Sequence, residues 1–215
     1  MQMPDEMSMG AGIGNRPGKE PSLGINFVWS GDAAEAEKHV APLRKAGTVV
    51  FEGIQAKDYV AVQRSGDFDD TRTFTGQMKT GFVNEISDDF IDKLVDNFEL
   101  HPDRGTRVGF AQCGGAISRV GRTETAFSHR EAQYVLMSFV SWTAGADGTD
   151  HVDYINSHWS NVGPFTTGFY VNDYFDQTQE QVNRTYRENF PRLLEIKQQY
   201  DPTNLFRLNA NIRST

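Results

Sequence analysis

The sequence lacks several features that would each define a class of protein. Its single cysteine, Cys113, excludes an internal disulfide and any metal cluster built on cysteines. No run of eighteen apolar residues occurs, so we expect no membrane-spanning helix. The formal net charge of −8 argues against a surface that neutralises phosphates, so we expect no nucleic-acid partner. The first residues carry no basic stretch and no apolar core, which predicts no secretory signal and a cytoplasmic location.

Motifs for phosphate binding and for nucleophilic catalysis are also missing. The sequence has no P-loop, no G-x-G-x-x-G behind a strand and no G-x-S-x-G elbow. The glycine cluster over residues 10–14 follows no predicted strand, and we interpret residues 1–21 as a loose lead-in. The five histidines lack zinc-ligand spacing, so we expect no metal site, and we expect His151 and His158 to lie solvated on the surface.

Apolar residues recur with the spacing of strands and helices along most of the chain. The 215 residues suffice for one large domain or two small ones, and an aromatic content of 12% favours a packed core. Helical spacing predicts helices after Asp32 and Ser87, and over residues 152–162, 178–188 and 189–200. A period of two predicts strands over residues 23–29, 48–51, 77–83, 107–113, 116–120 and 133–142, and a short strand or extended segment over 166–171.

The order of these elements predicts the fold class. Strands come in runs between helices, which favours an α+β fold with a mostly antiparallel sheet backed by helices. Residues 133–142 are apolar on both faces, so we place this strand in the centre of the sheet, covered on both sides. Residues 59–63 are mixed and polar, and we expect them in a loop or edge structure.

Two short segments bring together groups that could do chemistry. His129 and Arg130 stand at the entrance to the central strand, where a histidine beside a cation can donate a proton or bind a substrate. The alternative is a pair that merely caps the edge of the sheet. Tyr170, Asn172 and Asp173 give the second segment a hydrogen-bonding face, and the alternative there is an ordinary strand end with turn formers.

The C-terminus combines a helix stop with an apolar tail. Pro202 disfavours helix at Asp201 and cannot continue the ladder of helical hydrogen bonds. Leu205, Phe206 and Leu208 then supply an apolar anchor that a free terminus would not need. We therefore expect a short tail that docks on another surface.

This tail also resembles a known motif. K-x-x-Y-D-P-x-N-L-F-R-x-N-x-N-I, at residues 197–212, is similar to the closing motif of the berberine bridge enzyme-like flavoproteins. These are FAD-linked oxidoreductases of the vanillyl-alcohol-oxidase superfamily. T-A-F-x-H-R at residues 125–130 and Y-x-N at residues 170–172 resemble two further patterns of the family. The resemblance extends from residue 22 to residue 212 and covers only the C-terminal, substrate-domain portion of the family.

The resemblance implies roles for several residues around the flavin. It places Tyr170 and Asn172 against the flavin ring, as cofactor-binding residues. The family's second tyrosine, which serves some members as a catalytic base, is replaced here by Asp173, and Tyr174 follows one place later. Either Asp173, with a pKa raised by burial, or Tyr174 is the expected base.

The resemblance also implies substrate contacts and a division into domains. His129 belongs to the expected active-site wall as a catalytic residue, and His129, Arg130 and Gln112 are the expected substrate contacts. Residues 22–175 are the expected substrate-binding α+β domain. Residues 176–215 are the expected C-terminal helices and closing motif.

The function implied is the substrate-binding portion of an FAD-dependent oxidoreductase that oxidises an alcohol or amine-type small molecule by hydride transfer to flavin. FAD would be held mainly by a domain absent from this chain, so we expect no redox activity from the chain alone. The expected partners are a small-molecule substrate and either an FAD-binding domain or subunit, or a homodimer that covers the sheet. A stand-alone small-molecule binding protein and a non-redox enzyme, such as an isomerase or cyclase, remain open alternatives.

Overall fold

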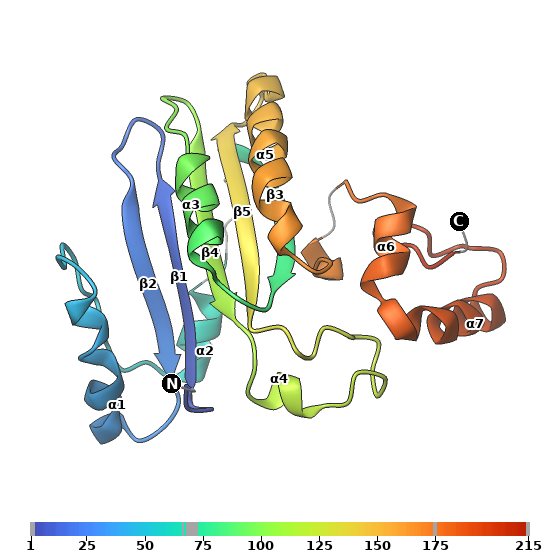
Figure 1. The fold of residues 1–215 in the computed structure, drawn as a ribbon, viewed down its shortest axis with the longest axis horizontal. Helices are drawn as coiled ribbons and strands as arrows, with labels where there is room; N and C mark the ends of the chain where they lie inside the picture. The colour runs from blue at the N-terminus through green and yellow to red at the C-terminus, as the bar shows by residue number, and fades with distance from the viewer. Residues whose placement is uncertain (1–2, 66, 68–72, 174–175, 214–215) are drawn as a thin grey trace.

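A five-stranded antiparallel sheet forms the centre of the molecule (Figure 1). The computed structural model describes residues 3–65, 67, 73–173 and 176–213. The strand order is β2-β1-β4-β5-β3, and each neighbouring pair is antiparallel. The predicted α+β class is therefore confirmed. The strands are β1 (Met7–Asn15), β2 (Ser22–Trp29), β3 (Phe74–Val83), β4 (Gly105–Gln112) and β5 (Tyr134–Thr143).

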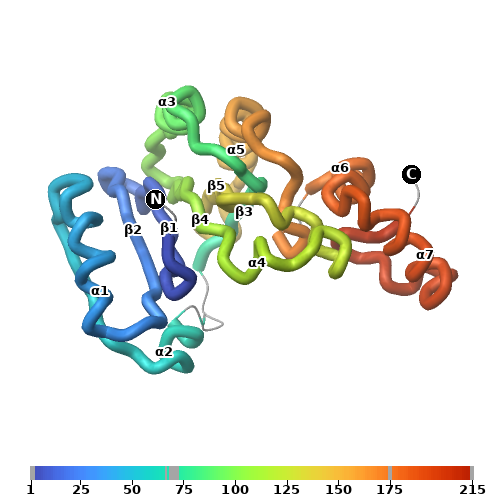
Figure 2. The backbone as a smooth tube through the Cα atoms, turned by 60° about the horizontal axis from the view of Figure 1, so that its bottom comes forward, coloured from blue at the N-terminus to red at the C-terminus, as the bar shows by residue number. Residues whose placement is uncertain are grey.

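Helices lie over one face of the sheet and beyond both of its edges. Helices α3 and α5 pack against each other on one side of the sheet, α1 lies beyond β2, and α6 and α7 lie beyond β3 (Figures 1 and 2). Among the described residues, no helix combines the length and apolarity needed to cross a membrane. The helices are α1 (Ala33–Val40), α2 (Tyr59–Arg64), α3 (Asp88–Asp96), α4 (Ala116–Arg119), α5 (Thr149–Val162), α6 (Gln179–Thr185) and α7 (Phe190–Tyr200).

The main core fills the space between the sheet and helices α3 and α5. Leu136 of β5 and Val108 of β4 are buried there against Phe90 and Val162 of the two helices. Burial of each such side chain stabilises the fold by roughly 1.5–3 kcal/mol. The central position predicted for residues 133–142 is confirmed, because β5 pairs with both β4 and β3. The helices cover one face of β5, while Met137 and its neighbours on the other face are only half-buried.

Two histidines of α5 belong to this helix-covered side, so the expectation of solvated side chains was wrong. His158 is 2% exposed and His151 is 7% exposed. Their seven-residue spacing places them on the face of α5 that turns toward the sheet. His158 Nδ1 lies 3.3 Å from the carbonyl oxygen of Asn97, to which it can donate, and Nε2 can accept from Ser138 Oγ at 3.1 Å. Burial lowers the pKa of both histidines, which keeps them neutral in the core.

The glycine cluster near the N-terminus forms strand β1, so the expectation of a loose lead-in was wrong over residues 7–15. This strand lies between β2 and β4. Gly12 faces Gly109 across the β1–β4 pair. A Cβ atom on Gly12 would lie 2.5 Å from the Val108 carbonyl oxygen, and one on Gly109 would lie 2.8 Å from the Ala11 carbonyl oxygen. The glycines here permit a close approach of two backbones, where the sequence alone suggested a break.

Three other segments differ from expectation for local reasons. Residues 48–51 form no strand and are largely exposed. Residues 59–64 form α2, because the Asp58 side chain accepts a hydrogen bond from the backbone N–H of Ala61 and caps the helix. Residues 116–119 form the short helix α4, which follows two glycines with positive φ, Gly114 and Gly115. The caps predicted at Asp32 and Ser87 are both present.

Replacing Gly12 by alanine tests the close approach of β1 and β4. Gly12→Ala should lower the free energy of unfolding by roughly 2–3 kcal/mol, because the new Cβ must displace backbone atoms of β4. Urea denaturation would measure the change. Gly24 is the matched control, because it pairs with Gly12 on β2 and has no atom within 4 Å of an added Cβ. Gly24→Ala should stay within about 0.5 kcal/mol of the wild type, and equal losses in both variants would contradict the interpretation.

Candidate functional site

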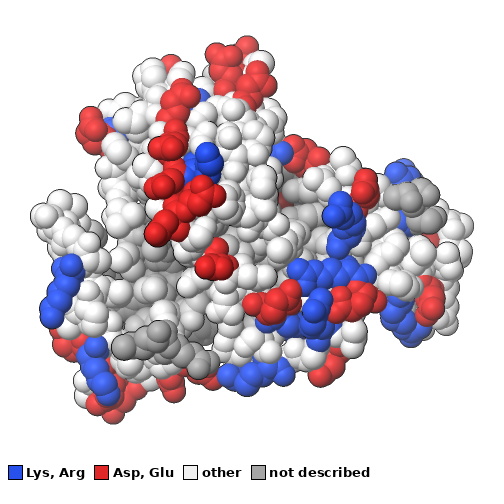
Figure 3. All heavy atoms as spheres, in the orientation of Figure 1, with Lys and Arg blue, Asp and Glu red and all other residues white. Residues whose placement is uncertain are grey.

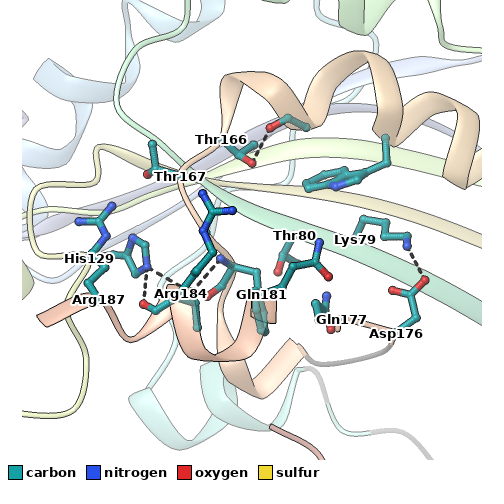
Figure 4. Close-up of a pocket in the computed structure, with 15 residues that line it drawn as sticks. Lys79, Thr80, His129, Thr166, Thr167, Asp176, Gln177, Gln181, Arg184 and Arg187 are labelled. Atoms are coloured by element: carbon teal, nitrogen blue, oxygen red, sulfur yellow. Dashed lines mark hydrogen bonds and ion pairs between the residues drawn. The ribbon is translucent and has the colours of Figure 1, made fainter. Parts of the chain in front are cut away.

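An open hollow lies between the edge strand β3 and helix α6 (Figure 4). Its volume is about 690 Å³, and residues 163–169, which follow α5, form its third side. Most of the lining side chains carry hydroxyl, amide or charged groups, and Trp159 adds an aromatic ring. The hollow is therefore suited to a small polar molecule. Its threonines are Thr80, Thr166, Thr167 and Thr185.

The charges that line this hollow are largely paired within the chain. Lys79 lies 2.5 Å from Asp176 at one end of the close-up in Figure 4, and Arg187 lies at the other end. Arg187 forms an ion pair with Glu131. Arg184 is 79% exposed and reaches into solvent. In Figure 3, acidic side chains follow α3, whereas basic and acidic side chains lie intermixed between α4 and α6. The hollow is thus lined by polar groups, with little charge that lacks a partner of opposite sign.

A buried set of hydrogen bonds joins the end of α6 to the loop before β5. We call this set, formed by Ser128, His129, Thr185 and Asn189, the joint. Ser128 Oγ donates to the carbonyl oxygen of Thr185 at 3.2 Å, and His129 Nε2 lies 2.9 Å from the same oxygen. The Asn189 side-chain amide donates, at 2.8, 3.1 and 3.3 Å, to the carbonyl oxygens of Arg122, Thr125 and Ala126.

His129 is neutral and nearly inaccessible in this arrangement. It is 3% exposed and stacks on Phe82 with 4.3 Å between ring centroids. Because the carbonyl oxygen of Thr185 can only accept, Nε2 carries the proton and Nδ1 is left as an acceptor. Nδ1 has no partner among the described residues. Burial, assisted by the positive charge of Arg187, lowers the pKa of His129 to about 4.

Arg130 is occupied by its own loop. Its guanidinium donates to the carbonyl oxygens of Phe127 and Ile117, both at 3.1 Å, and to Thr125 Oγ1 at 2.5 Å. It also lies over the Phe127 ring, 4.9 Å from its centroid. This geometry corresponds to the capping alternative considered from the sequence, and the substrate contact expected of Arg130 stays a prediction.

Gln112 lies away from the hollow. It is paired with Tyr134 in the β4–β5 register, and cross-strand partners share a face of the sheet. Tyr134 packs against the helix-covered core, so Gln112 points to that side. Its Oε1 is buried and has no partner among the described residues. The structure therefore does not bring Gln112 together with His129.

The second candidate segment borders a smaller hollow of about 340 Å³. Asn172 lines it together with Tyr186 and with Leu208 and Asn209 of the C-terminal tail. The Asn172 side-chain amide donates to the hydroxyl of Tyr170 at 2.7 Å. Asp173 is half-buried, and burial raises the pKa of its carboxyl. Tyr174 lies outside the described residues.

Residues 168–172 connect the two hollows. Gly168 and Phe169 line the larger one, and Val171 and Asn172 line the smaller one. The side chains of Asn172 and Asn209 bring amide groups to the smaller hollow.

Sequence reasoning missed the polar residues of α6 and its neighbours. Thr185, Arg187 and Asp176 carry no motif, because they meet His129, Glu131 and Lys79 only through contacts distant in sequence. Arg187 does adopt a positive φ of 51°, which is unusual for a residue with a side chain. Within the described residues, no group of three or more His, Cys, Asp or Glu side chains could hold a metal ion.

The chain is similar to several known proteins. Residues 160–213 match the family described as "Berberine and berberine like". The chain is 26% identical over 184 residues to the uncharacterized FAD-linked oxidoreductase YgaK of Bacillus subtilis, covering 85% of this chain and 41% of that protein. It is 27% identical over 222 residues to (R)-6-hydroxynicotine oxidase of Paenarthrobacter nicotinovorans, covering 98% of this chain and 48% of that enzyme.

A solved structure extends the likeness to the fold. BBE-like #28 from Arabidopsis thaliana superposes with a TM-score of 0.79 at 17% identity, covering 99% of this chain and 51% of that one. The chain spans less than half the length of the two curated relatives described above. YgaK is by name an FAD-linked oxidoreductase, and the partial coverage is consistent with FAD binding mainly in another domain. The chain belongs to the berberine bridge enzyme-like FAD-linked oxidoreductases and corresponds to their C-terminal portion.

Proposed function

We propose that this chain is the substrate-binding portion of an FAD-dependent oxidoreductase that oxidises an alcohol or amine-type small molecule. The observation that carries the proposal is the single segment, residues 168–172, that lines both hollows. A substrate in the larger hollow and a flavin edge in the smaller one would lie on either side of it. FAD, when bound, supplies the acceptor for the hydride that leaves the substrate carbon.

Each group of the chain has a proposed role in this reaction. The hydroxyl and amide groups of the larger hollow bind and orient the substrate. Tyr170 and Asn172 hold the edge of the flavin ring. Asp173 takes the proton from the substrate hydroxyl or amine as the carbon–oxygen or carbon–nitrogen double bond forms. His129, as a neutral group of the joint, fixes α6 and does not donate a proton.

The domain division remains part of the proposal. Residues 22–175, extended to include β1, form the substrate-binding domain, because β1 completes the same sheet. Residues 176–215 form the C-terminal helices and closing motif. The proposed partner is an FAD-binding domain or subunit in the cytoplasm, and a homodimer that covers the sheet is the competing arrangement.

The visible absorption spectrum of the purified chain tests the proposal most directly. The 215-residue chain alone, mixed with FAD and freed of unbound cofactor, should show no flavin band, because it provides only one wall of the site. A retained flavin band would show that the chain holds FAD unaided. A clean dimer without flavin that binds small molecules in the larger hollow would favour the binding-protein or non-redox alternative.

Removing the carboxylate of Asp173 tests its role as the base. In the flavin-bearing protein, Asp173→Asn should reduce the rate of flavin reduction by an alcohol or amine by at least about 100-fold. Because burial raises the pKa of Asp173, the wild-type rate should fall as the pH drops below that raised value. The variant should lose this acid limb. Asp92→Asn, on the exposed side of α3, is the matched control and should retain the wild-type profile.

The pH dependence of stability tests the neutral state of His129. In the folded chain its pKa is about 4, against an ordinary value of 6.5. Between these values the unfolded chain binds more protons, so the free energy of unfolding should fall by about 3 kcal/mol as the pH drops through this window.

His129→Gln should remove this part of the pH dependence in urea denaturation. Comparison at about pH 7.5, above both pKa values, separates the loss of packing from the loss of titration. A variant with the same slope as the wild type between pH 6.5 and 4 would contradict a buried, neutral His129.

A further inference from the structure

Two imidazole rings and a guanidinium group gather where α5 begins, apart from the side chains that line the two hollows. His151 stands in the first turn of α5, and its ring centroid lies 5.3 Å from that of His101, in the turn after α3. The Trp142 ring of β5 is also 5.3 Å away. Arg104, just before β4, places its guanidinium carbon 3.7 Å from the centroid of the Tyr154 ring. We call His101, Arg104 and His151 the basic cluster.

The basic cluster is largely closed to water, and its hydrogen bonding is incomplete. Arg104 is 2% exposed and His151 is 7% exposed. Arg104 donates from Nη2 to the carbonyl and carboxylate oxygens of Glu99, both at a long 3.4 Å, and the Glu99 side chain is 65% exposed. Arg104 Nε and His151 Nδ1 have no partner among the described residues. The buried positive charge is thus weakly compensated, so a second one beside it would be costly.

The titratable groups around His151 come from its own helix, from the turn before it and from the turn after α3. They are Asp147, Asp150, His101, Asp103 and Arg104. The three carboxylates are exposed to water, which weakens their attraction for a charged imidazole. Burial is the main cause that lowers the pKa of His151, followed by the positive charges of His101 and Arg104. The nearest group of β5, the Trp142 ring, brings no charge.

The apolar contacts at this end of α5 are separate from the main core. A small core of three buried side chains, Val140, Trp142 and Ile155, lies next to the basic cluster. The main core contacts α5 at its other end, through Val162. A segment held by few buried apolar contacts opens at a lower free energy than the whole chain. The first turns of α5 can therefore loosen while the main core stays packed.

We infer that the basic cluster is an acid-sensitive latch, in which protonation of His151 beside Arg104 releases residues 149–155 of α5 and the turn over residues 99–104. At neutral pH the uncharged His151 ring contacts both Trp142 and His101. In acid, an imidazolium there faces two cations where water barely reaches. Because the open segment binds the proton more tightly than the closed one, a fall in pH favours opening. The inference is independent of the proposed function.

Hydrogen exchange of the 215-residue chain at about pH 7.5 and about pH 5 tests the latch, with rates corrected for the effect of pH on chemical exchange. In the open segment His151 has its ordinary pKa of 6.5, so acidification to about pH 5 favours opening by about thirtyfold. Protection over residues 149–155 should fall at least about tenfold. This loss should be insensitive to low concentrations of urea, because a local opening exposes little surface.

Three histidine variants identify the group that titrates. His151→Gln keeps a polar side chain that cannot be protonated, so its protection over residues 149–155 should change by less than about threefold between the two pH values. His101→Gln removes one facing cation and should make the loss at least about twofold smaller. His39→Gln is the matched control, because His39 is half-buried against Trp29 beyond β2, and it should show the wild-type loss. Melting temperatures at about pH 7.5 show whether each variant is folded.

The urea dependence separates the latch from acid unfolding of the whole chain. A loss over residues 149–155 that ignores low urea and disappears in His151→Gln supports the latch. A loss that depends on urea as steeply as exchange over residues 134–138 of β5 would show global unfolding, to which His129 and His158 contribute, and would overturn the inference. An undiminished loss in His151→Gln would also overturn it. If that variant does not fold, an undiminished loss in His101→Gln has the same meaning.

Discussion

The buried hydrogen bonds of the joint connect the two parts of this molecule. Helices α6 and α7 lie beyond the β3 edge of the sheet (Figure 1). Thr185 binds Ser128 and His129, while the Asn189 side chain donates to three carbonyl groups of the loop before β5. These bonds set the walls of the larger hollow. Leaving one of these buried groups without a hydrogen bond would cost about 1–3 kcal/mol of stability, and this cost holds the joint in one geometry.

The same joint explains how His129 contributes to the site. A histidine near a hollow is often considered as an acid or base, but this one is enclosed and lies near the positive charge of Arg187. Both effects favour the neutral imidazole, whose single N–H is used to bind Thr185. Asp173 is therefore the proposed base. Burial raises the pKa of its carboxyl, and it follows Asn172, a proposed flavin contact, in the chain.

Charged groups and exposed apolar groups lie in different parts of the molecule. Ion pairs such as Lys79–Asp176 neutralise the larger hollow, which leaves neutral polar groups to select a ligand. Leu205, Phe206 and Leu208 are instead exposed on the C-terminal tail, whose backbone donates hydrogen bonds to the Asp201 side chain.

Elements whose residues interact with near neighbours in the chain could be predicted from the sequence. Local preferences explain the alternation in β2 and β5, the caps at Asp32 and Ser87 and the helix stop at Pro202. The α+β class and the family could also be inferred from the sequence. The role of the β1 glycines could not be predicted, because the backbone of β4 is what leaves no room for a Cβ atom there. The contacts of His158 with Ser138 and of Thr185 with His129 could not be predicted either, because these partners are 20 and 56 residues apart in the chain. Spacing along a sequence describes one element at a time, whereas a site depends on which elements pack together.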